Sequence, residues 1–349
     1  MTSRQRWLAL LNGQKPDRIP TDYWATPEVT AGLLDKLGCE NEWELFDKLH
    51  IDRPYHLTAP RTVTASPTDP RADIWGVRFD KVDYGTGAYS EVSYNPLADV
   101  DTVRQIHEYP WPNWEDHDWD EAARRAENIP EDRIVFSGGY EPFLLYCRMR
   151  GLEQAMMDLF LSPEIAEAAL EHIFDYHYRV NSRLFEIGGE KIHVACQAED
   201  LGSQTHLLMG LDQIRRFLTP HQKKMGDLAR SHGYKILYHT DGAARDALPD
   251  LVDVVGINVL NPIQWRCPGM EREGLVRDFA DRLIFHGAID NQQTLPFGTV
   301  EDVRQEVLDC IRIFSPARWV CAPCHNIQPV TPIENIVAMY ETIHKHGKL

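Results

Sequence analysis

Five short apolar runs in the second half of the chain each end in a group of polar side chains. Helical patterns separate the runs, which span residues 191–196, 235–238, 252–257, 283–285 and 318–320. Continuous apolar segments of this length are typical of parallel strands that helices cover on both faces. In a barrel of such strands the reactive groups lie where the strands end, around one mouth. We therefore expect the five polar groups to form a single site.

Three earlier segments bring the number of predicted strands to eight. Residues 18–24 and 133–136 have strand character, and residues 51–57 form a weaker candidate because Pro54 interrupts them. Helices are predicted over residues 3–12, 27–37, 42–49, 141–160 and 163–187. Thr299 with Asp302, and Thr331 with Glu334, predict capping boxes at the last two helices. The pattern predicts an α/β fold, a single (β/α)8 TIM barrel domain over residues 1–349.

Residues 60–130 interrupt the alternation of strands and helices. Within them, residues 75–79 and 89–94 flank residues 83–88, which predicts a β-hairpin. The apolar content of this stretch is too thin for a second core. We expect an insertion on the barrel mouth rather than a separate domain.

Charge and cysteine content narrow the classes of function. The chain has 36 Lys and Arg against 53 Asp and Glu, a net charge of −17, which disfavours binding to nucleic acid and anionic membranes. Apolar runs of about 18 residues, the length that spans a bilayer, are absent from the sequence. Seven scattered cysteines do not resemble a disulfide framework, and residues 1–6 lack the apolar core of a signal peptide. We expect a reduced, cytoplasmic protein that acts on a small molecule.

His239 and Asp241 form the first chemical motif, at the end of a predicted strand. In extended chain, side chains two residues apart lie on the same side, so both can face one ligand. Imidazole and carboxylate suit a divalent metal or an acid/base pair. The alternative is a structural role, in which a neighbouring acid hydrogen-bonds the histidine and the pair stabilises the loop.

A second motif, Cys321-Ala-Pro-Cys324-His325, follows the last predicted strand. A C-x-x-C pair can be a redox centre or half of a zinc site, but the sequence contains no second pair. Cys321 adjoins the apolar run and is expected to be a buried small hydrophobe. Cys324 and His325 lie beyond the strand, where their side chains can reach the mouth.

Further polar residues follow the other runs. Glu199 and Asp200 are adjacent and point in different directions in extended chain, so one can face the mouth while the other caps a turn. Asp290 is placed similarly, after the run at residues 283–285. Asn261, Gln264 and Gln292 can hydrogen-bond a substrate, or can simply tie loops together.

Seven segments, taken in order, resemble the uroporphyrinogen decarboxylase superfamily. They are residues 12–20 (Asn-Gly-Gln-Lys-Pro-Asp-Arg-Ile-Pro), 199–204, 239–242, 260–264, 287–290, 295–299 and 331–336. The resemblance spans nearly the whole chain and implies one (β/α)8 barrel with an active cleft at its C-terminal mouth. It also implies that homodimers are common among the relatives.

The superfamily contains at least two chemistries. True uroporphyrinogen decarboxylases use no metal, and they hold substrate carboxylates with an arginine-rich segment after the first strand. Here residues 20–28 contain no cation, a departure that argues against a porphyrinogen substrate. The other branch resembles zinc-dependent corrinoid methyltransferases, in which zinc activates an acceptor thiol for methylation by a corrinoid protein.

The methyltransferase branch holds zinc with a His-x-Cys pair and a distal cysteine. The resemblance places His239 at the histidine, Cys324 at the distal cysteine, and Asp241 where the first cysteine is expected. His325 can substitute for Cys324, because the loop register is ambiguous by one residue. Carboxylate is a harder ligand than thiolate, which leaves the methyl acceptor open.

Three functions follow as hypotheses. The first is metal-dependent methyl transfer to a thiol or small nucleophile, with a corrinoid protein as partner. The second is metal-free decarboxylation, in which Glu199 or Asp200 stabilises intermediates and His239 or Tyr140 donates a proton. The third is a protein that binds a corrinoid or tetrapyrrole without turnover. The remaining candidate roles are catalysis for His325 and substrate binding for Trp24, Asn261, Gln264, Asp290 and Gln292.

Overall fold

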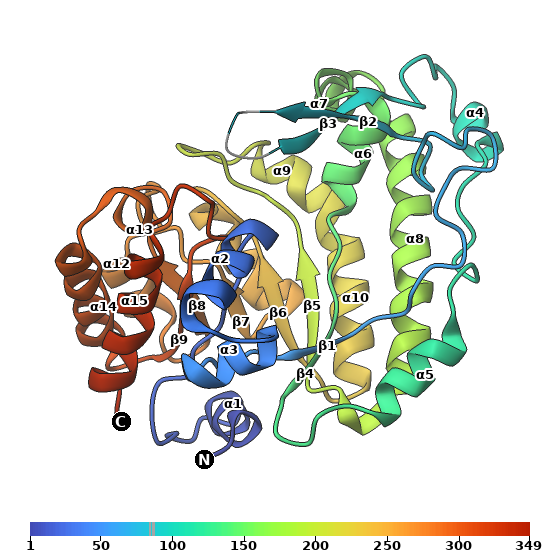
Figure 1. The fold of residues 1–349 in the computed structure, drawn as a ribbon. Helices are drawn as coiled ribbons and strands as arrows, with labels where there is room; N and C mark the ends of the chain where they lie inside the picture. The colour runs from blue at the N-terminus through green and yellow to red at the C-terminus, as the bar shows by residue number, and fades with distance from the viewer. Residues whose placement is uncertain (84, 86–87) are drawn as a thin grey trace.

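A curled parallel sheet of seven strands forms the centre of the molecule (Figure 1). The computed structural model describes residues 1–83, 85 and 88–349. The strands of the sheet are β1 (Tyr55–Leu57), β4 (Val135–Gly138), β5 (Val194–Ala198), β6 (Lys235–His239), β7 (Val259–Asn261), β8 (Ile284–Ile289) and β9 (Arg318–Pro323), adjacent in that order. The predicted α/β barrel is confirmed.

The segment at residues 20–25 occupies the eighth position, between β9 and β1. Thr21 pairs in parallel with Cys321 of β9, and the Asp52 N–H, just before β1, donates to the Thr21 carbonyl at 2.9 Å. Residues 18–24 are therefore placed as predicted, but they make isolated bridges rather than a regular strand. Pro20 has no N–H to give to a ladder, which limits the regularity of this segment.

Helices surround the sheet and lie between consecutive strands (Figure 1). They are α1 (Ser3–Leu11), α2 (Pro27–Leu37), α3 (Glu42–Lys48), α4 (Val103–Glu108), α5 (Trp119–Glu127), α6 (Pro142–Arg150), α7 (Leu152–Leu161), α8 (Pro163–Gly188), α9 (Leu211–Gln213), α10 (Thr219–Ser231), α11 (Leu248–Asp250), α12 (Arg272–Phe279), α13 (Thr294–Phe297), α14 (Val300–Phe314) and α15 (Ile333–His346). The single helix expected over 141–160 is two, because Gly151, with φ of 89°, separates α6 from α7.

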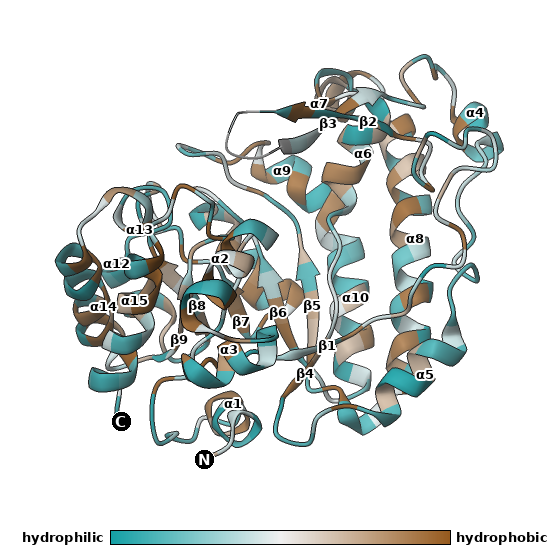
Figure 2. Ribbon diagram, viewed as in Figure 1, coloured by the Kyte–Doolittle hydropathy of each residue, from teal (hydrophilic) through white to brown (hydrophobic). Residues whose placement is uncertain are grey.

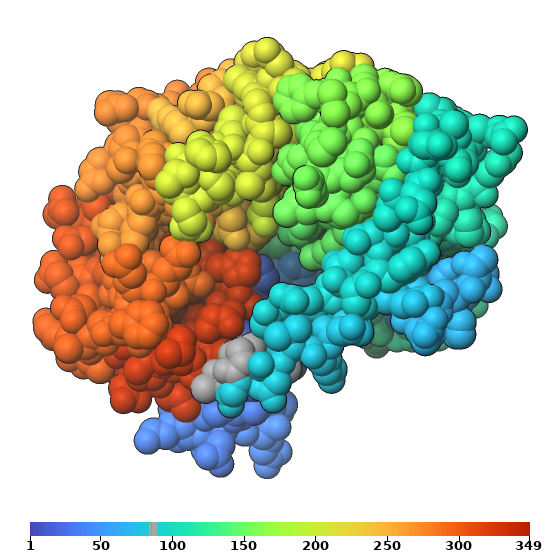
Figure 3. Space-filling model, turned by 90° about the horizontal axis from the view of Figure 1, so that it is seen from above, coloured from blue at the N-terminus to red at the C-terminus, as the bar shows by residue number. Residues whose placement is uncertain are grey.

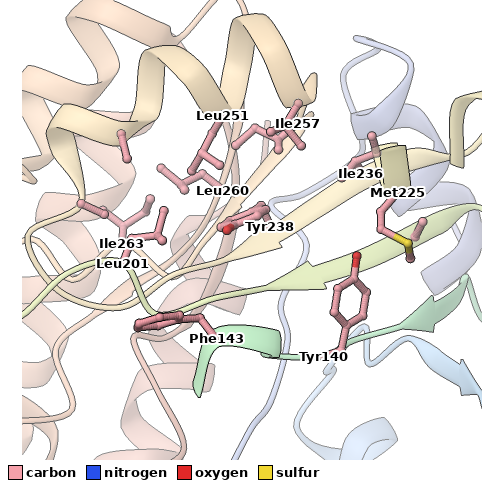
Figure 4. Packing of buried hydrophobic residues seen from close by; sticks show 14 of the residues in the cluster. Tyr140, Phe143, Leu201, Met225, Ile236, Tyr238, Leu251, Ile257, Leu260 and Ile263 are labelled. Carbon is pink, nitrogen blue, oxygen red and sulfur yellow. The ribbon is translucent and has the colours of Figure 1, made fainter. Parts of the chain in front are cut away.

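One predicted strand is wrong. Residues 252–257 are not extended: a π-helical turn spans Leu251–Val255, and the strand is β7, which starts two residues after Ile257. The buried residues of the turn are Leu251 and Val255, four apart, as on one face of a helix. Gly256, with φ of 80°, ends the turn. Figure 4 shows Leu251 beside Leu260 of β7 in the buried cluster.

The two capping-box predictions have different outcomes. Thr299 and Asp302 form both reciprocal hydrogen bonds at the start of α14, as predicted. The prediction at Thr331 is wrong, because α15 begins only at Ile333 and the buried Thr331 hydroxyl has no hydrogen-bond partner among the described residues.

The predicted hairpin is confirmed as β2 (Arg78–Asp83) and β3 (Ala88–Tyr94), an antiparallel pair outside the barrel sheet. β2 begins later than expected. Of the predicted connecting loop, Tyr84, Thr86 and Gly87 lie outside the described residues. The stretch before the hairpin packs on α8, where Trp75 meets Tyr176 edge to face at 4.9 Å between ring centroids. The single-domain boundary at 1–349 stays a prediction.

The lower half of the barrel is apolar and closed from below by α1. Trp7 is fully buried there, meets Phe136 of β4 at 5.3 Å between ring centroids, and donates its indole N–H to the Asp52 carbonyl at 2.8 Å. Inward side chains of six strands complete this layer: Ile134 and Phe136, Val194, Leu237, Val259, Ile284 and Val320. In Figure 2 the central strands carry apolar colour, whereas α3 and α5 at the periphery are mostly hydrophilic.

The length and apolar character of the helices bear on whether any of them could span a membrane. In the part of the chain that the structure describes, no helix has both the length and the apolar character needed to cross a bilayer.

Replacing Trp7 by alanine is expected to lower the free energy of unfolding by about 3–5 kcal/mol, because it opens a cavity beneath the barrel and removes the bond to Asp52. Chemical denaturation followed by circular dichroism measures this. Phe160→Ala is the control: Phe160 is 66% exposed on α7, and its replacement should change the free energy by no more than about 0.5 kcal/mol. Equal effects of the two variants would contradict the conclusion that Trp7 packs beneath the barrel and closes its lower end.

Candidate active site at the barrel mouth

The space-filling view from above shows a hollow at the centre of the molecule, which is the mouth of the barrel (Figure 3). The sequence segments that end β5, β6, β7, β8 and β9 border this mouth, because the C-terminal ends of parallel strands meet at one edge of their sheet. His239 is the last residue of β6, and His325 follows β9 by two residues. The strand order thus brings together the polar groups that follow these strands, as the sequence predicted.

His239, Asp241 and His325 come together at this edge. Each offers one donor atom, and the three atoms lie within 4.8 Å of one another. Nε2 of His325 is 3.5 Å from Oδ2 of Asp241. Trp24, 41% exposed, lies beside both imidazoles, with its ring centroid 4.3 Å from that of His325 and 5.8 Å from that of His239. The group combines nitrogen and oxygen donors, which suit zinc and similar divalent cations.

A second group shares His239 and adds Glu141 and Asp200, again within 4.8 Å. Oδ1 of Asp200 is 3.8 Å from Nε2 of His239, and the same oxygen accepts the Asp241 N–H at 3.1 Å. Burial raises the pKa of Glu141 and of Asp241, and the neighbouring Asp200 acts in the same direction. Sequence reasoning missed Glu141, although it follows β4 by three residues, where the strand-end rule applies.

The other ring nitrogen of His239 faces into the barrel. Nδ1 lies 2.7 Å from Oδ1 of Asn261, and Nδ2 of Asn261 lies 2.7 Å from Nδ1 of His286 on β8. Nε2 of His286 is 3.0 Å from Oδ2 of Asp22. Asn261 was predicted to contact substrate, and here it joins two histidines. Asp22 and His286 were not predicted as site residues, although His286 directly follows the apolar run at residues 283–285.

A chamber of about 200 Å³ lies beneath Trp24, above the apolar layer. Its polar lining includes Asp22, Asn261, His286, Arg53 and His56. Nη1 of Arg53 donates to Oδ1 of Asp22 at 3.1 Å. His56 is accessible to solvent inside the chamber although protein surrounds it, and burial together with Arg53 lowers its pKa to about 4. The mouth thus contains a cation that the sequence of residues 20–28 did not reveal.

Cys324 does not join the donor group in the structure. Its side chain is buried, and Sγ donates to the Ile263 carbonyl at 3.0 Å. It borders a second cavity, of about 280 Å³, that Asp241 and His325 also line. Of the two neighbouring candidates for the distal ligand, the structure thus brings His325, and not Cys324, to His239 and Asp241. Cys321 is fully buried, in agreement with its predicted role as a small hydrophobe.

The amides of the second cavity connect neighbouring loops. Oε1 of Gln264 accepts the Gly242 N–H at 2.8 Å, and its Nε2 donates to Oε1 of Gln204 and Oε1 of Gln292, both at 3.2 Å. Gln264 is buried, whereas Gln292 is exposed and lines the cavity. Of the two predicted substrate contacts, Gln292 is the better placed to meet a ligand.

Two other predicted site residues, Asp290 and Glu199, already make hydrogen bonds or ion pairs within the protein. Asp290 is buried, pairs with Arg266 at 2.7 Å and accepts the Thr294 N–H at 3.0 Å. Glu199 is buried at the start of α6 and accepts the N–H groups of Phe143 and Leu144 at 2.7 and 3.1 Å. Burial raises the pKa of Glu199 to about 8. These contacts support bracing and helix capping rather than contact with a substrate.

Tyr140 is also buried, and Figure 4 shows it within the hydrophobic cluster. It stacks on His177 at 5.0 Å between ring centroids, and its hydroxyl has no hydrogen-bond partner among the described residues. Burial raises its pKa well above the ordinary value, so the hydroxyl stays protonated at neutral pH.

Comparisons with known proteins agree with this architecture. Residues 81–346, more than half of the chain, match the family described as Uroporphyrinogen decarboxylase (URO-D). The chain belongs to the URO-D family. Among solved structures, a methyltransferase from Methanosarcina mazei is similar over 99% of both chains, with 19% identity and a TM-score of 0.70. That likeness shows that the URO-D protein described here shares the fold of the archaeal protein along its whole length.

Two further solved structures show weaker similarity. The IOLI protein with a binding zinc atom is 13% identical, with 70% of this chain and 82% of that chain covered and a TM-score of 0.36. D-psicose 3-epimerase from Clostridium cellulolyticum H10 is 11% identical, with 70% and 80% covered and a TM-score of 0.34. No curated protein matches the URO-D chain.

Arg53→Gln is expected to raise the pKa of His56 from about 4 toward its ordinary value of 6.5, because it removes a nearby positive charge. NMR titration of ¹⁵N-histidine-labelled protein measures this. In the wild type, the unfolded chain binds a proton at His56 near pH 6.5 and the folded chain only near pH 4, so His56 destabilises the fold as the pH falls through that window.

Arg53→Lys keeps the charge and is the matched control. His193 is an internal control: its pKa is also lowered to about 4, by burial and by Arg4, and should not respond to either change at Arg53. A pKa of His56 that stays the same in Arg53→Gln would show that Arg53 does not act on the chamber.

Proposed function

We propose that this URO-D family protein is a metal-dependent methyltransferase, with a corrinoid protein as methyl donor and a thiol or other small nucleophile as acceptor. The observation that carries the proposal is the convergence of His239, Asp241 and His325 at the barrel mouth. The full-length likeness to a protein named a methyltransferase supports the reaction class. We assign the metal to these three residues, and Glu141 and Asp200 stand beside them as further oxygen donors.

The residues fit a divalent cation by their charge as well as their spacing. Among the ion pairs of the described residues, Asp200 and Asp241 pair only with His239 and His325, and neither meets a lysine or arginine. The 3.8 Å between His239 Nε2 and Asp200 Oδ1 is too long for a hydrogen bond. Acceptor atoms that face one another at this spacing are stabilised by a cation between them.

A bound zinc ion would lower the pKa of an acceptor thiol, so that the thiolate is present at neutral pH. The acceptor has to lose its proton, and Glu141 and Asp200 are the carboxylates placed next to the donor group to take it. Trp24 lies beside the imidazoles on the side of the chamber, and the amide of Gln292 lines the second cavity together with Asp241 and His325. A methyl-corrinoid would supply the methyl group: its carbon–cobalt bond would break with the electron pair left on the corrinoid, while the deprotonated thiol of the acceptor would form the carbon–sulfur bond.

Purified protein supplied with zinc is expected to hold about one metal ion per chain, and His239→Ala and His325→Ala to lose it. Elemental analysis after gel filtration measures the content. The matched comparison is Cys324→Ala, which should keep the metal because Cys324 bonds to the Ile263 carbonyl in the structure. Loss of metal in Cys324→Ala with retention in His325→Ala would make Cys324 the ligand instead.

Methyl transfer from methylcobalamin to simple thiols is expected in the zinc-loaded protein and is expected to fall at least about 100-fold in His239→Ala. The change in corrinoid absorbance under anaerobic conditions follows the reaction, and chelator treatment should abolish it reversibly. A rate that survives complete removal of metal would contradict the mechanism. Tight corrinoid binding without turnover would favour a binding protein.

Metal-free decarboxylation remains a second candidate, because Arg53 places a guanidinium in the chamber where it can hold a substrate carboxylate. Carbon dioxide release from candidate carboxylic acids distinguishes the two functions. Release that a chelator does not affect and that Arg53→Gln abolishes would establish decarboxylation.

A further inference from the structure

A line of hydrogen-bonding side chains crosses the barrel interior from the segment that closes it to the candidate metal group. It runs from Asp22 through His286 and Asn261 to His239, and its three contacts measure 3.0, 2.7 and 2.7 Å. The four side chains come from residues 20–25, β8, β7 and β6, so the line joins elements far apart in the sequence. Each contact needs one donor and one acceptor, and this requirement fixes where every proton lies.

The line starts at a group that can only accept. Oδ1 of Asp22 accepts the Tyr23 N–H at 2.8 Å and Nη1 of Arg53 at 3.1 Å. Although burial raises it, the net pKa of Asp22 lies well below the ordinary value because Arg53 and His286 favour the carboxylate. An ionised carboxylate has no proton to give. The proton between Asp22 Oδ2 and His286 therefore belongs to Nε2 of His286.

The remaining protons follow in order. Nδ2 of Asn261 faces Nδ1 of His286, and because an amino group can only donate, Nδ1 of His286 is the acceptor of this contact. The Asn261 amide is thereby oriented with Oδ1 toward His239. Since a carbonyl oxygen can only accept, Nδ1 of His239 must donate to it.

We infer that Asp22, His286 and Asn261 hold His239 in the tautomer with its proton on Nδ1, so that the lone pair of Nε2 points at the donor group formed with Asp241 and His325. Asp22 and His286 are positioning residues, because they act on His239 through Asn261. The tautomer itself rests only on the hydrogen-bond line. Its consequence for metal binding rests on the proposed function.

The surroundings keep the line intact. His286 and Asp22 are 5% and 7% exposed, so water has little access to replace their contacts. The Trp7 ring stacks against His286 with centroids 6.0 Å apart and planes 25° apart, which restricts rotation of the imidazole. Metal-binding histidines are commonly oriented by a hydrogen bond at the other ring nitrogen. Here the bond is made by the Asn261 amide, and Asp22 sets the orientation of that amide through His286.

The test measures tautomers directly. Full-length protein labelled with ¹⁵N-histidine and freed of metal is examined by long-range ¹H–¹⁵N NMR at about pH 8, above the ordinary histidine pKa of about 6.5. His239→Gln and His286→Gln identify the two sets of signals. We expect protonated Nδ1 in His239 and protonated Nε2 in His286. A proton on Nε2 of His239, alone or together with one on Nδ1, would overturn the inference.

Asp22→Asn tests whether the line sets the tautomer. The two donors at Oδ1, the Tyr23 N–H and Arg53, hold the oxygen of the new amide in place, so its amino group faces His286. The line then reverses, and we expect the His239 proton to move to Nε2. Asp158→Asn is the matched control, because Asp158 is also a buried aspartate paired with an arginine, Arg150, outside the line.

A second variant covers the case in which Asp22→Asn does not fold. Asn261→Leu removes the link next to His239, and we expect a mixture of both His239 tautomers. Unchanged His239 tautomers in every variant that folds would overturn the inference.

The zinc affinity of each variant separates the tautomer from the proposed function. Zinc affinity measured by competition with a chromophoric chelator should fall about 10- to 100-fold in Asp22→Asn and stay unchanged in Asp158→Asn. An unchanged affinity in Asp22→Asn, with the proton moved, would contradict the consequence for metal binding. If the wild type shows the expected tautomers but binds no zinc, the proposed function fails while the hydrogen-bond line stands.

Discussion

The pairing of Asp22 with Arg53 and His286 links closure of the barrel to its interior. Asp22 lies on the segment that fills the eighth position, Arg53 precedes β1, and His286 belongs to β8. An unpaired buried carboxylate costs several kcal/mol, so each partner stabilises the position of the others. If the closing segment shifted along β9, the buried carboxylate of Asp22 would lose its contacts with Arg53 and His286. The irregular segment at residues 20–25 is therefore held in register by side chains as well as by its isolated backbone bridges.

The interior divides into an apolar half and a polar half. Barrels of this class usually fill their centre with layers of branched apolar side chains. Here Phe136, Leu237 and their neighbours form such a layer over Trp7, whereas the layer above contains Asp22, His286 and Asn261. Polar side chains can line the open end because they form hydrogen bonds with one another.

The sequence predicted the barrel and the place of the site because both follow from apolar runs with polar ends. His239, Asp241 and His325 were found in this way, and the same rule would have found Glu141. It overestimated Glu199 and Asp290, since a polar residue after a strand can equally cap the next helix. It assigned no role to His286, which directly follows the apolar run at residues 283–285; β8 extends to Ile289, so His286 lies inside the strand and lines the chamber. The prediction of a strand at 252–257 was wrong because a continuous apolar run does not reveal the helical spacing of the buried residues Leu251 and Val255.

The selection of His325 over Cys324 depends on how the chain leaves β9. Cys324 and His325 lie in a bend directly after β9, and their side chains point in different directions. In the structure the thiol turns inward to the Ile263 carbonyl, and the imidazole turns toward the mouth beside Trp24. A donor set of two imidazoles and carboxylates is harder than one with thiolates and gives less electron density to a metal. Such a metal would be a stronger Lewis acid, so it would lower the pKa of a bound acceptor further and make the resulting anion less nucleophilic. If the proposed function holds, such a site would favour acceptors with a high intrinsic pKa, because these gain more from the lowered pKa than they lose in nucleophilicity.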